Sequence, residues 1–118
     1  MRRGDDLKER TKRFALRVIR MVEALPKGKT SEVIGRQLLR SGTSVGANYR
    51  ASCRAKSPAD FISKMGTVEE EADESIFWME LLVESGLINE QLLKDLMHEA
   101  EEILAIIITS IKTVRKTA

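Results

Sequence analysis

Apolar residues recur along most of this chain at intervals of three and four positions, which is the spacing of one face of an α-helix. Four such runs occupy approximately residues 7–25, 34–49, 61–83 and 92–114. No segment alternates apolar and polar residues as a half-buried strand would. The pattern therefore predicts an all-α protein, an up-down antiparallel four-helix bundle that forms a single domain over residues 1–118.

Helix-ending residues separate the four runs. Pro26 and Gly28 interrupt the chain after the first run, and Thr30 or Ser31 is expected to cap the second helix. The second helix is expected to continue to the sequence KSP at 56–58, where Ser57 caps the third helix. The third helix should end before Gly86, and the fourth should begin near Asn89.

The apolar positions of each run define the expected core. The inward-facing residues are expected to be Leu7, Phe14, Val18, Met21, Val22 and Leu25, then Ile34, Leu38, Val45 and Tyr49, then Phe61, Met65, Val68, Ala72, Ile76, Met79 and Val83, and finally Leu92, Leu93, Leu96, Ala100, Ile103, Leu104, Ile107, Ile111 and Val114.

The second run has an unusual composition for a helix, RSGTSVGANYRASCRAKS at 40–57. On a helical wheel of 100° per residue its glycines gather on one flank, where the missing Cβ atoms let a neighbouring helix approach closely. Its arginines fall within an arc of about 80° that points away from the core. We expect a helix-packing seam at Gly35, Gly42 and Gly46, and an outward basic stripe, our candidate nucleic-acid-binding residues, at Arg36, Arg40, Arg50 and Arg54.

The third run carries large apolar residues outside its core stripe. Phe77, Trp78 and Leu81 lie off that stripe, beside Glu70 and Glu74. An exposed apolar patch on a small protein often marks an interface, so these five residues are our candidate oligomer interface. The alternative is a wide core face, or an indole that lies flat across a helix junction.

Charge is distributed unevenly along the chain. Residues 1–64 hold 16 basic and 6 acidic residues, whereas residues 65–118 hold 4 basic and 12 acidic ones, within a formal net charge of +2. Such asymmetry indicates either a nucleic-acid footprint or complementary surfaces that meet within or between subunits. With no long apolar segment and a single cysteine, we expect a cytoplasmic protein without a membrane partner.

The sequence offers little for catalysis. His98 is the only histidine, and Asp95 three residues before it superficially resembles half of a di-iron site, which requires a second histidine. We expect His98 to be a surface residue and Cys53 to be a packing residue. The prediction is a protein that is not an enzyme and has no catalytic residue, metal site or cofactor.

Residues 37–88 carry a family resemblance. Arg40-Ser41, Ser44-Val45-Gly46-Ala47-Asn48, Arg54, Ser57, Asp60-Phe61 and Glu80-Leu81-Leu82 before Gly86 resemble the small four-helix-bundle proteins named after the intervening sequences of bacterial 23S ribosomal RNA. The chain departs at 49–51, where it reads YRA and many members have an apolar residue followed by Ala-Glu-Gly. The resemblance implies a ring, commonly a homopentamer, without established enzymatic activity. A related accessory protein of diversity-generating retroelements resembles the same fold, and its ring is associated with nucleic acid and a reverse transcriptase. The resemblance therefore implies these two as partners.

The leading hypothesis is therefore a ring-forming, non-catalytic protein that associates with RNA or DNA, or acts as a scaffold, through its basic surface. One alternative is a purely structural oligomer whose arginines pair with glutamates of neighbouring subunits. The other is a metal-binding bundle enzyme.

Overall fold

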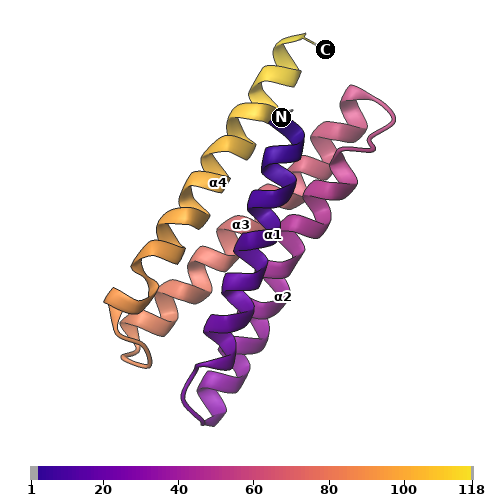
Figure 1. Ribbon diagram of the computed structural model, residues 1–118. Helices are drawn as coiled ribbons and strands as arrows, with labels where there is room; N and C mark the ends of the chain where they lie inside the picture. Colours follow the sequence, from indigo (N-terminus) through magenta and orange to yellow (C-terminus); the bar gives the residue numbers. More distant parts are fainter. Residues whose placement is uncertain (1–2, 118) are drawn as a thin grey trace.

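The computed structural model describes residues 3–117, which form four α-helices joined by short connections (Figure 1). They are α1 (Arg3–Glu23), α2 (Lys29–Ser52), α3 (Pro58–Glu84) and α4 (Glu90–Thr117). Because each connection is only about five residues long, successive helices run antiparallel and pack side by side, α1 on α2, α2 on α3 and α3 on α4. The bundle closes where α4 meets α1, which is the least extensive of the four contacts. The predicted all-α, up-down antiparallel four-helix bundle is confirmed.

The core follows the predicted stripes closely. Phe14, Leu38, Met79 and Ile103 are among the large side chains that are at most 1% exposed. Leu92 was expected in the core but is 67% exposed. It lies on the flank of α4 that faces α1, and the sparse contact between these two helices leaves that flank open to solvent.

The helix ends agree only in part with the predicted caps. Ser57 caps α3 as expected, since its Oγ accepts a hydrogen bond from the amide of Asp60 at 3.0 Å. The prediction that Thr30 or Ser31 caps α2 is wrong. The helix starts at Lys29, and the carbonyl of Gly28 accepts its first bond, from the amide of Glu32 at 3.0 Å. Gly28 has φ +150, a conformation that residues with a side chain rarely adopt.

Glycines bring α2 close to α1. A Cβ atom placed on Gly42 would lie 2.8 Å from both γ carbons of Val18, and one on Gly46 would lie 3.3 Å from the carbonyl oxygen of Thr11. A Cβ on Gly35 would meet Leu25 Cδ1 at 2.9 Å. Val22 of α1 is the next neighbour of Gly35, at 3.4 Å, so all three glycines of the predicted seam lie against α1, and an added Cβ atom would require a neighbouring group to shift.

Candidate nucleic-acid interface

Basic residues from three helices and one connection collect toward one end of the bundle. The start of α1, the connection between α2 and α3, and the end of α4 all lie at this end (Figure 1). Seven of the side chains are exposed and Lys8 is partly buried. We call the set the basic end: Lys8, Lys12, Arg50, Arg54, Lys56, Lys112, Arg115 and Lys116.

Side chains of the basic end form no ion pair with the residues that the structure describes. Lys64 lies beside the basic end and does form an ion pair, since its Nζ is 2.7 Å from Oδ1 of Asp60. This contact, followed by a hydrogen bond from the amide of Lys56, lowers the pKa of Asp60. Asp60 is thus held mainly by Lys64, and the eight cations have no carboxylate within ion-pair distance among the described side chains.

The four predicted arginines separate into three environments. Arg50 and Arg54 belong to the basic end, although Arg54 does not lie on a helix. The prediction that α2 continues to KSP is wrong, because α2 ends at Ser52 with Cys53 as its cap. Only the other three predicted arginines therefore lie on α2 and share one arc of its surface. Arg36 is exposed toward the opposite end, beside Lys27 and Glu32.

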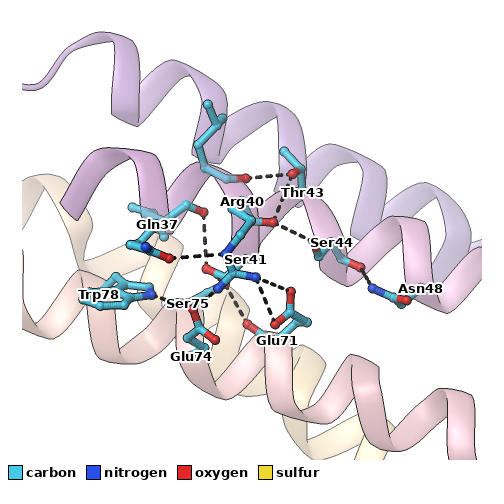
Figure 2. Close-up of polar contacts among 12 residues, drawn as sticks. Gln37, Arg40, Ser41, Thr43, Ser44, Asn48, Glu71, Glu74, Ser75 and Trp78 are labelled. Atoms are coloured by element: carbon cyan, nitrogen blue, oxygen red, sulfur yellow. Dashed lines mark hydrogen bonds and ion pairs between the residues drawn. The ribbon is translucent and has the colours of Figure 1, made fainter. Parts of the chain in front are cut away.

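Arg40 instead joins α2 to α3 (Figure 2). Its guanidinium contacts Glu74, and its Nη1 lies 3.0 Å from Oε2 of Glu71. The hydrogen bond to Glu74 is the main cause that raises the pKa of Arg40. Two acidic side chains of its own chain therefore occupy Arg40, and the predicted stripe loses it as a free cation.

Glu74 is held from two sides. Trp78 Nε1 donates a hydrogen bond to Glu74 Oε2 at 2.9 Å, and this bond, followed by the contact with Arg40, lowers the pKa of Glu74 (Figure 2). Beneath these groups, Ser75 and Ser41 form a buried hydroxyl pair at 3.0 Å. The glutamate and the indole that the sequence assigned to an oligomer interface are thus engaged within the chain.

The rest of the candidate oligomer interface is mixed in exposure. Phe77 is 49% exposed and packs edge-to-face on Trp78, whereas Trp78 and Leu81 are partly buried against the core. Glu70 is exposed. Trp78 and Leu81 therefore lie at the margin of the core, and Phe77 projects from it.

A further exposed apolar residue lies on the same side of the bundle. Because α2 and α3 are antiparallel, Val33, seven residues before Arg40, comes level with Leu81, seven residues after Glu74. Val33 is 52% exposed. We call Val33, Phe77, Trp78 and Leu81 the apolar patch.

Of the basic end, the sequence pattern predicted only Arg50 and Arg54. Lys8 and Lys12 contribute to the general positive charge of the first half, and Lys112, Arg115 and Lys116 belong to a half that is acidic overall. A signal was present in the predicted topology. In an up-down bundle of four helices the last helix ends beside the start of the first, so basic residues in these two segments come together.

The residues considered for catalysis lie at the surface. His98 is exposed, and its Nε2 lies 3.0 Å from Oε2 of Glu102. Cys53 is exposed at the end of α2, so the expectation that it packs in the interior is wrong. Among the described side chains, those of residues 6–117, no three His, Cys, Asp or Glu are grouped as a metal site would require. No helix in the part of the chain that the structure describes is long and apolar enough to cross a membrane.

The fold and the site define a class: small antiparallel helical bundles with a glycine-packed helix pair and one strongly basic end. Within that class, the chain belongs to the 23S rRNA-intervening sequence protein family, whose model matches residues 6–109. A similar solved structure is a protein of unknown function from the S23 ribosomal protein family of Bacteroides thetaiotaomicron. It is 35% identical, with a TM-score of 0.84, and the match covers 90% of this chain and 98% of that one. No curated protein sequence matches this chain.

Proposed function

We propose that this protein is a non-catalytic, self-associating protein that binds the phosphate backbone of RNA or DNA through its basic end. The observation that carries the proposal is the gathering of eight cations, from three helices and the connection between α2 and α3, without an ion-pair partner among the described residues. The family to which the chain belongs is also named after an intervening sequence of 23S ribosomal RNA.

The chemistry of the basic end favours contact with backbone over contact with bases. Lysine and arginine release counterions when they neutralise phosphates, and this supplies affinity that does not depend on sequence. Base stacking needs accessible aromatic rings. Phe14 and Tyr49, the aromatic residues of α1 and α2, are 1% and 7% exposed, and Phe61 at the start of α3 is partly buried against the core. We therefore expect sequence-tolerant binding that weakens steeply with salt.

A pair of charge-reversal variants tests this proposal. In the first, Arg54, Lys56 and Arg115 of the basic end are changed to Glu. In the matched control, three exposed lysines of the opposite end, Lys27, Lys29 and Lys94, are changed to Glu, so both variants have the same net charge. Fluorescence anisotropy with a labelled 30-base-pair DNA duplex and an RNA duplex of the same sequence measures affinity across a salt series.

The first variant should lose binding while the control retains most of it. Equal loss in both variants would mean that only overall charge matters, and a native protein that binds neither duplex would end the proposal. If the first variant binds weakly because its oligomer dissociates, the cations belong to a subunit contact, and the purely structural oligomer becomes the better account.

Self-association is the second part of the proposal, and the apolar patch supports it. An exposed phenylalanine and valine beside half-buried Trp78 and Leu81 form the kind of surface that a second copy can cover. If the patch meets a different surface of the next copy, the contact is heterologous and can close into a ring. The five subunits that the resemblance implies remain part of this proposal.

Light scattering coupled to size-exclusion chromatography tests the patch. Phe77→Ser should shift the protein toward monomers at micromolar concentration, and helical circular dichroism should be retained because Phe77 is not buried. Leu92→Ser is the matched control, since Leu92 is 67% exposed but lies on α4 away from the patch. A native protein that is already monomeric would contradict this part of the proposal.

A further inference from the structure

A groove runs along the outer side of the contact between α1 and α2, toward the basic end. Three cations line it: Lys8 and Lys12 from α1, and Arg50 from α2. Between them lie only small residues, namely Ala15, Thr43, Gly46 and Ala47. The groove is thus a shallow channel with long basic side chains at its rim and short side chains on its floor.

The close packing of the two helices explains this shape. Gly46 faces Thr11 so closely that a Cβ atom would be 3.3 Å from the carbonyl oxygen, and Ala47 is the next residue along α2. With no side chain longer than that of threonine on the floor, the surface between the rim residues is hollow. The Thr43 hydroxyl donates within its own helix, to the carbonyl of Leu39 at 2.7 Å. The polar groups left to a ligand are therefore the three cations.

We propose that this groove is where a backbone phosphate of the nucleic acid lies closest to the protein. The inference rests on the proposed function and names the contact point within it. Lys8, Lys12 and Arg50 supply ammonium and guanidinium donors from two helices, and the short floor lets the phosphate and its sugar approach between them.

The local charge pattern supports an anionic occupant. None of the three cations has an ion-pair partner among residues 3–117 whose side chains are described. At 100° per residue, the neighbouring acidic residues Asp6 and Glu9 lie on the side of α1 that points away from α2. The groove therefore presents positive charge that no described carboxylate offsets.

Filling the floor without changing the charge is the sharpest test. Ala47 is exposed, so Ala47→Leu should fold normally while its larger side chain occupies the groove. Ala51→Leu is the matched control, because Ala51 is also exposed on α2 but does not line the groove. The 30-base-pair DNA duplex and the matching RNA duplex serve as probes, and the affinity of each variant is measured from 50 to 300 mM salt.

We expect Ala47→Leu to weaken binding of both duplexes and to lower the slope of log affinity against log salt by about one, as the loss of one phosphate contact does. Arg50→Gln should have the same effect, whereas Ala51→Leu and Arg36→Gln should leave the slope unchanged. Light scattering of each variant in the absence of nucleic acid reports whether the oligomer is intact.

Two results would overturn the inference and leave the proposed function standing. One is native affinity for Ala47→Leu and Arg50→Gln when reversal of Arg54, Lys56 and Arg115 abolishes binding. The other is dissociation of the oligomer by Ala47→Leu, which would assign the groove to a second copy of the chain. Failure of the native protein to bind either duplex would remove both the inference and the proposed function.

Discussion

Helix α2 contacts its two neighbours by different means. Toward α1 it presents glycines, and the two helices pack closely because Val18 and the backbone of Thr11 fill the space that a Cβ would take. Toward α3 it presents polar groups, the Ser41 hydroxyl and the Arg40 guanidinium, which bond to Ser75, Glu71 and Glu74. One contact is sensitive to added volume, and the other is sensitive to lost partners and to pH.

The contrast also explains which basic side chains remain unpaired. On the α3 side, arginine and glutamates neutralise each other within the chain. On the α1 side, short residues bring the helices together and leave the basic side chains at the groove unpaired. The unusual composition of α2 therefore serves two packing contacts and one open basic surface.

The largest effect should come from adding volume on the α1 side. Gly42→Leu should lower the free energy of unfolding by about 3 kcal/mol, since even a Cβ would lie 2.8 Å from two carbons of Val18. Urea denaturation followed by circular dichroism measures the change. As a control, Gly66→Ala should raise stability by up to about 1 kcal/mol, because Gly66 lies inside α3 with nothing within 4 Å of a new Cβ. Equal stability of Gly42→Leu and the native protein would refute a tight seam.

The next effect should come from removing a partner on the α3 side. Ser75→Ala should cost about 1 kcal/mol, since it removes the buried bond between Ser75 and Ser41. In a double-mutant cycle, Ser41→Ala combined with Ser75→Ala should cost less than the two single changes together. Ser44→Ala is the control, because the Ser44 hydroxyl donates only within α2, to the carbonyl of Arg40. Strict additivity in the cycle would show that the hydroxyl pair carries no coupling.

A smaller effect should separate the glycines of the seam from one another. Gly35→Ala should stabilise by about 0.5 kcal/mol, because helix propensity improves and the obstructing Leu25 Cδ1 is the movable end of a flexible side chain. Gly46→Ala should be near neutral, since its Cβ would lie 3.3 Å from a backbone oxygen that cannot rotate away. Thermal unfolding ranks the two variants, and the reverse order would contradict this account.

The smallest effect concerns pH. The folded pKa of Glu74 is lowered, first by the Trp78 hydrogen bond and then by Arg40, so the carboxylate contributes stability above its ordinary pKa. That contribution is lost as the pH falls through the lowered value. Trp78 is the only tryptophan, so its fluorescence should follow the protonation of Glu74.

Replacing Arg40 should move this transition. Arg40→Gln raises the pKa of Glu74 toward its ordinary value, and the fluorescence midpoint in a titration should shift to higher pH. Arg36→Gln should leave the midpoint in place, because Arg36 is not in contact with Glu74. A titration that is identical in all three proteins would show that Arg40 does not act on the Glu74–Trp78 pair.

The sequence by itself determined the fold class, because apolar residues at helical spacing allow few arrangements other than packed helices. It also determined the family, since the residues from Arg40 to Gly86 carry a resemblance that the match over residues 6–109 confirms. The Ser57 cap of α3 was also predictable from the sequence, because the bond to the amide of Asp60 involves only residues that are close together in the chain.

Only the tertiary structure decided how the charged residues are used. Arg36, Arg40 and Arg50 lie within one arc of one helix, yet Arg40 meets glutamates 31 and 34 residues away while Arg50 lines a groove with lysines of α1. Lys112, Arg115 and Lys116 join the basic end only because α4 returns to the start of α1. A helical wheel gives the direction of a side chain from its own axis. The charge of a surface depends on which other helix lies in that direction, and packing over the whole chain sets that.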